Sequence, residues 1–175
     1  MLTLHRAGDA AVLVRDDRIA GLGPYQELAA AHPDARVREW PGARITAGRV
    51  EPDAVWLLEH RYHPDPREEL GTEPVALPDG LDEGHYGGLG GSARRGLQRL
   101  LAGGTTALVG PFEQPAVRAA VRRSGLRVVD STAHGSAAFE CVPAIGERAD
   151  FAVFDAVEDH CLATVLAGRL VFRRR

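Results

Sequence analysis

The closing stretch "GERADFAVFDAVEDHCLATVLAGRLVFRRR", residues Gly146–Arg175, decides how the rest of the sequence is interpreted. Apolar residues alternate in "FAVFD", a charged turn follows, and a second apolar run precedes a basic tail. This alternation is typical of β-strands that are buried on one face and separated by a turn. We therefore expect the chain to close with strands of a small sheet, which must bury its apolar face against another layer.

The first fifty residues offer the strands of that second layer. Apolar runs at residues 2–5, 10–15 and 18–23 are separated by the turn pairs Gly8-Asp9 and Asp16-Asp17, and the last two runs are expected to form a hairpin. A helix is predicted over 24–32 and a strand over 35–40. Residues 1–50 and 146–175 are therefore predicted to form one small composite β-sandwich. Its expected core residues are Val12, Leu13, Val14, Ile19, Val153, Phe154, Val165 and Val171.

Residues 51–145 are predicted to be an inserted α/β segment. A helix is expected from Asp53, as its cap, to Tyr62, followed by a long Gly- and Pro-rich loop over 71–91. A second helix over 92–104, capped by Ser92, is followed by a strand, a helix and another strand. The two strands, at 105–110 and 126–131, are expected to pair in parallel. The fold class is therefore mixed α/β.

Composition excludes several classes of function. A formal charge of −3 over 175 residues argues against nucleic-acid binding, which favours a basic excess. No apolar stretch approaches the roughly 18 residues of a membrane span, and the N-terminus does not resemble a signal peptide. The two cysteines, Cys141 and Cys161, form no CxxC motif. We therefore expect a cytoplasmic protein with reduced thiols.

The two ends of the chain resemble the amidohydrolase superfamily. "DDRIAGLGP" (16–24) is similar to the opening strand of its small sandwich domain. Ala149-Asp150 and the V-x-x-G-x-x-V spacing of Val165, Gly168 and Val171 are similar to its closing strands. "RRGLQRLLAGGTTAL" resembles the first barrel helix and the strand that follows it. Imidazolonepropionase and aminodeoxyfutalosine deaminase are the nearest in kind. The resemblance implies hydrolysis of a cyclic or amidine C–N bond and a catalytic metal such as zinc.

The sequence departs from that family where its metal chemistry resides. The resemblance implies that the sandwich strand runs through Pro-Gly into a His-x-His pair that ligates the metal. The corresponding stretch here is "TAGRVEPDAV" (46–55), in which Glu51 and Asp53 stand instead. Only about fifteen residues separate "RVVDS" from "GERADF", too few for even one further βα unit. A complete (β/α)₈ barrel needs about 200 residues or more. Most of the catalytic barrel is therefore expected to be missing.

"HRYHPDP" is the strongest candidate for chemistry. The spacing of His60, His63 and Asp65 is compatible with zinc binding. The alternative is a helix C-terminus at which the His side chains interact with the helix dipole and Pro64-Asp65 ends the helix. For acid–base catalysis the candidates are His63, Asp65, Glu83 and His85. The last two lie in the Gly-rich loop, where a solvated turn is the alternative.

"GGLGGSARRG" is a candidate anion site. Gly90 and Gly91 would let backbone N–H groups approach a ligand at the start of a helix, with Ser92, Arg94 and Arg95 adding polar and positive groups. A flexible connector with an N-cap is the alternative, because the stretch matches neither a P-loop nor a dinucleotide fingerprint.

Two functions remain open at this point. The resemblance implies a hydrolase of non-peptide C–N bonds that lacks the usual metal-binding residues. The alternative is a non-catalytic binding or assembly protein, because the parallel strands of an incomplete barrel have edges that need covering. A second copy of the chain or a partner polypeptide would provide that cover, and a small-molecule ligand is compatible with either function.

Overall fold

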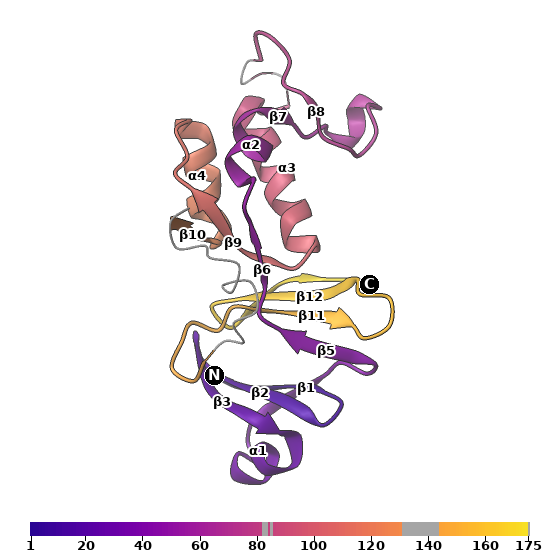
Figure 1. Cartoon of the computed structure of the whole chain (residues 1–175), viewed down its shortest axis with the longest axis vertical. Helices are drawn as coiled ribbons and strands as arrows, with labels where there is room; N and C mark the ends of the chain where they lie inside the picture. The colour runs from indigo at the N-terminus through magenta and orange to yellow at the C-terminus, as the bar shows by residue number, and fades with distance from the viewer. Residues whose placement is uncertain (82–83, 85, 131–143, 175) are drawn as a thin grey trace. The chain divides into compact units, whose positions relative to one another are not determined.

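The computed structural model describes residues 1–81, 84, 86–130 and 144–174, and it has the expected mixed α/β architecture. The chain separates into two compact units (Figure 1). Unit 1 comprises Met1–Arg49, Leu101–Thr106 and Gly135–Arg175, and unit 2 comprises Val50–Leu100 and Ala107–His134. Among the described residues, no helix combines the length and the apolar character that crossing a membrane requires.

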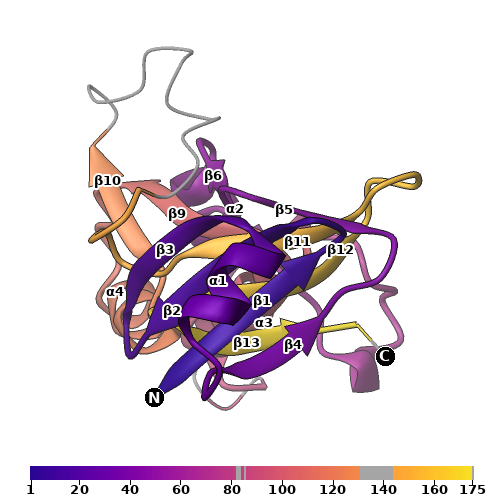
Figure 2. The same ribbon diagram turned by 90° about the horizontal axis from the view of Figure 1, so that it is seen from below.

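The first sheet of unit 1 comes entirely from the start of the chain. Its strand order is β3-β2-β1-β4, and its members are β1 (Leu2–Ala7), β2 (Ala10–Arg15), β3 (Arg18–Pro24) and β4 (Arg36–Glu39). The hairpin predicted at Asp16-Asp17 joins β2 and β3, with Asp16 at a φ of 56°. Helix α1 (Tyr25–Ala31) covers the face that carries Leu4 and Leu13 (Figure 2).

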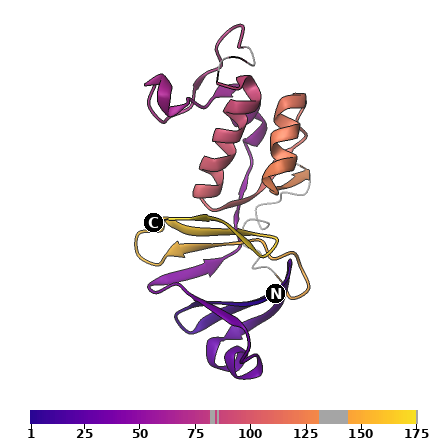
Figure 3. The same ribbon diagram turned by 180° about the vertical axis from the view of Figure 1, so that it is seen from behind.

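The second sheet of unit 1 combines both ends of the chain. Its order is β13-β12-β11-β5, with β5 (Ala43–Thr46), β11 (Phe151–Asp155), β12 (Cys161–Leu166) and β13 (Arg169–Arg173). Strand β5 pairs antiparallel with β11, so a strand from the first fifty residues completes the sheet formed by the last thirty (Figure 3).

One hydrophobic cluster joins the two sheets of unit 1. Val12, Val14 and Ile19 from the first sheet share it with Val153 and Val165 from the second. Leu13 and Phe154 are also buried, but each lies on the opposite face of its strand, in a separate cluster.

The expectation that Val171 is a core residue is wrong. Its side chain is 38% exposed. Leu170 pairs with Val165 and Phe172 with Thr164, so a β-bulge leaves Val171 as the extra residue between them. A bulge breaks the two-residue alternation on which the prediction rested.

The closing motif is held by hydrogen bonds to strand ends. The buried carboxylate of Asp150 accepts from the Ala167 backbone N–H at 2.8 Å and from Arg148 at 3.0 Å. Gly168 follows at a φ of +73°, where a Cβ would lie 2.1 Å from the Asp16 carbonyl oxygen. The Ala-Asp and Gly positions noted in the sequence therefore close the turns of unit 1.

Unit 2 carries most of the helices and a small sheet. Its elements, some of which extend into unit 1, are β6 (Arg49–Glu51), α2 (Ala54–Glu59), β7 (Arg61–Tyr62), the 3₁₀ turn η1 (Pro66–Glu68), β8 (Val75–Ala76), α3 (Gly88–Ala102), β9 (Thr105–Gly110), α4 (Pro115–Ser124) and β10 (Arg127–Asp130). The order of the sheet is β10-β9-β6. The predicted parallel pairing of β9 with β10 is confirmed.

Two predicted helices have different bounds. Helix α2 ends at Glu59 instead of reaching Tyr62, because Arg61 and Tyr62 pair with β8, and Asp53 makes no side-chain cap. Helix α3 begins at Gly88, so Ser92 lies inside the helix and does not cap it. The Gly91 N–H already donates to the Gly87 carbonyl at 2.7 Å, which starts the helical ladder within the glycine-rich stretch.

Candidate functional site

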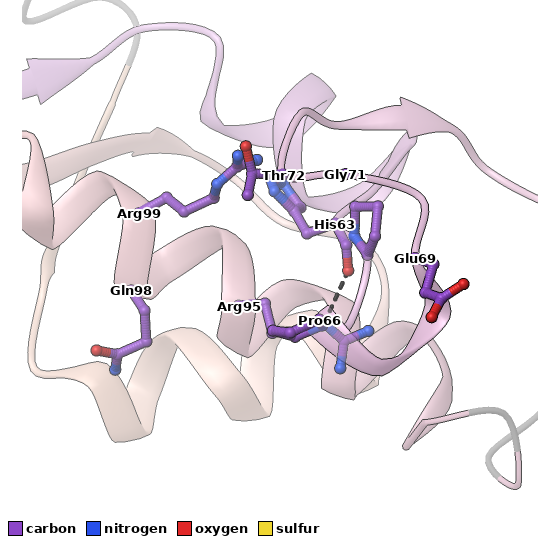
Figure 4. Close-up of a pocket in the computed structure, with 9 residues that line it drawn as sticks. His63, Pro66, Glu69, Gly71, Thr72, Arg95, Gln98 and Arg99 are labelled. Atoms are coloured by element: carbon purple, nitrogen blue, oxygen red, sulfur yellow. Dashed lines mark hydrogen bonds between the residues drawn. The ribbon is translucent and has the colours of Figure 1, made fainter.

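A cavity of unit 2 has a volume of about 530 Å³. One wall is the segment that follows β7, and the other is a face of α3 (Figure 4). The lining residues are His63, Pro64, Pro66, Glu69, Gly71, Thr72, Arg95, Gln98 and Arg99. The three α3 residues recur at the spacing that places helix side chains on one face.

Hydrogen bonds and burial hold His63 in place in the wall formed by the segment after β7. Its side chain is 4% exposed, its backbone N–H donates to Ser92 Oγ at 2.9 Å, and its Nε2 lies 2.9 Å from the Leu57 carbonyl oxygen. Nε2 therefore carries the proton, since a carbonyl can only accept. Burial lowers the pKa of His63, and the neighbouring guanidinium groups act in the same direction. The ring is thus neutral, and Nδ1 is buried without a hydrogen-bond partner in the described residues.

Arg95 of α3 connects the two walls of the cavity through hydrogen bonds. Its Nε donates to the His63 carbonyl at 2.8 Å, Nη1 to the Tyr86 carbonyl at 3.1 Å and Nη2 to Tyr62 Oη at 3.4 Å. The Tyr62 hydroxyl also contacts both carboxylate oxygens of Glu68 at 2.8 Å. Burial and that carboxylate raise the pKa of Tyr62 to about 12. Arg95 is therefore a fixed part of the wall, since its nitrogens already have acceptors.

Asp65 has a structural role in the same segment. Its side chain caps η1 by accepting from the Arg67 N–H at 3.1 Å, and Glu68 reaches back to the Asp65 N–H at 2.5 Å. The Arg67 guanidinium also donates to this carboxylate at 2.7 Å. These bonds lower the pKa of Asp65 to about 2. A carboxyl group this acidic is a weak base for catalysis near neutral pH.

The metal site considered for His60, His63 and Asp65 does not fit this geometry. Within the described part of the chain, no three His, Cys, Asp or Glu side chains are grouped so that they could hold a metal ion. His60 is exposed at the end of α2, the His63 imidazole is engaged by Leu57, and Asp65 is engaged by Arg67.

The candidate anion residues do not gather at one point. Ser92 is fully buried and is used by the His63 N–H, while Arg94 is exposed and Arg95 lines the cavity. At Gly91 a Cβ would lie 2.2 Å from the Tyr86 carbonyl oxygen. Close backbone packing therefore accounts for this glycine. Gly90 stays in the first turn of α3, where a Cβ would make only ordinary contacts.

Some candidates cannot be placed. Glu83, His85 and Cys141 lie outside the described residues. Cys161 is buried in β12, as expected for a cysteine that acts as a small apolar residue.

Sequence reasoning missed the cavity residues Thr72, Gln98 and Arg99. The helical spacing of Arg95, Gln98 and Arg99 was the available signal, because it places all three on one face of α3. Nothing in the sequence indicated that residues 63–72 would fold back against this face.

Residues 10–35 match the family model of the bacterial imidazolonepropionase-like composite domain. The matched stretch contains β2, β3 and α1 of unit 1. A search of curated proteins gives no significant match to the chain.

Several solved enzymes are partly similar to the chain. Guanine deaminase from Bradyrhizobium japonicum is 22% identical with a TM-score of 0.43, over 71% of this chain and 28% of that one. Aminofutalosine deaminase from Helicobacter pylori is 13% identical with a TM-score of 0.48, over 74% and 33%. An adenosine deaminase from Xanthomonas campestris with bound zinc is 19% identical with a TM-score of 0.47, over 73% and 33%.

The chain spans about a third of the length of these enzymes. At these TM-scores the similarity assigns no role to any residue of this chain. The resemblance seen in the sequence is confirmed over residues 10–35, which are similar to the imidazolonepropionase-like composite domain of bacteria.

Proposed function

We propose that the chain is a non-catalytic binding protein that holds a small organic molecule in the cavity of unit 2. The observation that carries this proposal is the cavity itself, whose volume of about 530 Å³ falls in the range of roughly 300–1,000 Å³ usual for small-molecule sites. Its walls are pre-organised, because His63 and Arg95 are fixed by hydrogen bonds to Ser92, Leu57 and Tyr86. Such walls lose little conformational entropy when a ligand binds.

The lining favours a ligand with an apolar body and one polar or anionic end. Pro64, Pro66 and the methylene groups of the arginines offer apolar contact. Arg99 is available to bind such an anionic end, because its one ion pair within the described residues joins Glu73 at 3.6 Å and the Glu73 side chain is 89% exposed. An exposed pair of this kind is weak, so a ligand carboxylate or sulfonate can replace it.

Anilinonaphthalene sulfonate, an apolar dye with one anionic group, is a suitable probe of this cavity. Gln98→Trp fills the cavity from α3, while Arg94→Trp places the same side chain on an exposed position of the same helix. We expect Gln98→Trp to weaken dye binding at least about tenfold and Arg94→Trp to leave it unchanged, measured by fluorescence titration. Equal binding by the two variants would contradict the proposal.

A second candidate function is hydrolysis of non-peptide C–N bonds, which the composite-domain match favours. It predicts that the purified protein carries a stoichiometric transition metal and that His63→Ala loses it. Metal analysis of the wild-type protein and of this variant separates the two functions. Metal that is present in the wild-type protein and absent from His63→Ala would support the hydrolase. A wild-type protein that contains no metal and still binds the dye would support the binding function.

The organisation proposed for the chain follows the same resemblance. Residues 1–50 with 146–175 would be the composite β-sandwich, and 51–145 an inserted remnant of a (β/α) barrel. Strand β10 lies at one end of its sheet and carries Val128, which is 49% exposed. Because an edge strand with an exposed apolar side chain can pair with another chain, we propose that a second copy of the chain packs on this part of unit 2. Sizing by light scattering tests this, and a stable monomer at micromolar concentration would contradict it.

A further inference from the structure

We propose that unit 1 contains an anion-binding site for the phosphate group of a small molecule, formed by Arg36, Arg38 and Arg173. This site is separate from the cavity of unit 2. The three residues and Trp40 line a pocket of about 210 Å³, together with Val37 and Glu39. Strand β4 is the last strand of the first sheet and β13 the last strand of the second, and the two lie at the same side of unit 1 (Figure 2).

The strand pattern directs the three guanidinium groups toward one another. Arg36, Arg38 and Trp40 alternate along the chain, so their side chains lie on the same face. Trp40 shows which face this is, because it belongs to the hydrophobic cluster between the two sheets. From the other sheet, Arg173 pairs with Ala163 of the same cluster, and its guanidinium lies 5.5 Å from the centre of the Trp40 ring. The arginines therefore converge where the gap between the sheets opens to solvent.

The positive charge of this pocket has no ion-pair partner among the described residues. Arg36, Arg38 and Arg173 form no salt bridge in the part of the chain that the structure describes. Glu39 is the one acidic residue of the pocket lining, and its carboxylate is already paired with Arg6 at 3.3 Å. The Glu39 side chain also alternates to the opposite face of β4 from the arginines. Three like charges close together repel one another, and an anion bound among them would relieve that repulsion.

The chemistry of the pocket matches phosphate in particular. Guanidinium groups bind phosphate oxygens through paired N–H donors, which a planar fork positions better than an ammonium group does. The pocket is small and its aromatic wall is closed, because Trp40 is only 7% exposed. A nucleobase could not stack on that ring. The site therefore suits one phosphate or diphosphate group, with the remainder of the ligand outside.

Calorimetric titration with inorganic pyrophosphate and inorganic phosphate tests the site in the full chain. Arg38→Gln and Arg173→Gln each remove one guanidinium from the pocket. Arg169→Gln is the matched control, because it removes the same charge from an exposed position of the same strand β13. We expect each pocket variant to weaken pyrophosphate binding at least about tenfold and Arg169→Gln to weaken it less than twofold.

A thermal shift measurement keeps the test valid if a variant folds poorly. Pyrophosphate is expected to raise the melting temperature of the wild-type protein and of Arg169→Gln, but not that of the double variant Arg38→Gln, Arg173→Gln. An equal response to sulfate at the same ionic strength, or equal weakening by Arg169→Gln, would overturn the proposal, because either result indicates non-specific charge attraction. Since none of these residues lines the cavity of unit 2, dye binding there is expected to stay unchanged.

Discussion

The Cα atom of Gly96 in α3 lies directly against the imidazole of His63. A Cβ added at position 96 would come within 2.6 Å of His63 Nε2 and 2.8 Å of Leu58 Cδ2. The absence of a side chain at this helix position therefore lets the segment after β7 approach α3 and close one wall of the cavity.

Gly96→Ala should lower the free energy of unfolding even though alanine is the better helix former. The new methyl group must displace the buried His63 ring and break its bond to Leu57, at a cost of about 1–3 kcal/mol, against a helix-propensity gain of about 1 kcal/mol. Urea unfolding measures the balance. Gly90→Ala in the same helix is the control, because its nearest neighbour would be 3.6 Å away. That variant should be neutral or slightly more stable, and equal loss in both variants would contradict the packing argument.

Asp150→Ala should destabilise unit 1 by roughly 3 kcal/mol. The carboxylate is buried and accepts from the Ala167 N–H and from Arg148, and each hydrogen bond to a charged group contributes about 1.5–3 kcal/mol. The midpoint of denaturant unfolding is the measurement. Asp34→Ala, at an exposed turn, should stay within about 0.5 kcal/mol of the wild type. An Asp150→Ala variant with the same unfolding midpoint as the wild type would mean that the closing turns do not depend on this side chain.

Apart from β5, which was not predicted, the strands of unit 1 were predictable because their information is local. Val12 and Val14 follow a two-residue period, and turn pairs such as Asp16-Asp17 mark where the chain reverses. The prediction that Val171 is a core residue was wrong because the bulge opposite Thr164 and Val165 depends on the partner strand. A single strand's sequence does not encode the register of its neighbour.

The sites were less predictable, because they depend on contacts between distant segments. "HRYH" indicated chemistry at His63, but its backbone N–H donates to Ser92 and its ring packs against Gly96, both about thirty residues later. The glycine-rich run was interpreted as a loop, whereas it starts α3 at Gly88. Arg36 and Arg173 lie at opposite ends of the chain, and only the meeting of two sheets brings them to one pocket.

Glu59→Ala should destabilise unit 2 by about 1–3 kcal/mol. The Glu59 side chain is buried, and its carboxylate accepts from the Gln114 N–H at 2.7 Å, at the N-cap of α4. A negative charge at a helix N-terminus is also favourable. Glu59→Gln keeps an acceptor and loses the charge, so its stability should lie between that of the wild type and that of Glu59→Ala. Chemical denaturation followed by far-UV circular dichroism gives this order. An alanine variant as stable as the glutamine variant would show that the N-cap bond contributes nothing.

Stability should fall as the pH is lowered from about 6.5 to about 4, because of His5. Burial, with a smaller contribution from Arg38, lowers the pKa of His5 to about 4 from its usual 6.5. The unfolded chain therefore binds a proton in this range while the folded chain does not, so acidification favours unfolding. A shift of this size corresponds to roughly 3 kcal/mol, and the lowered pKa of His63 acts in the same direction.

Urea midpoints recorded across this pH range should show a shallower slope in His5→Gln, whose side chain cannot titrate. The exposed His60→Gln should keep the wild-type slope. An unchanged slope in His5→Gln would assign the acid sensitivity to other groups.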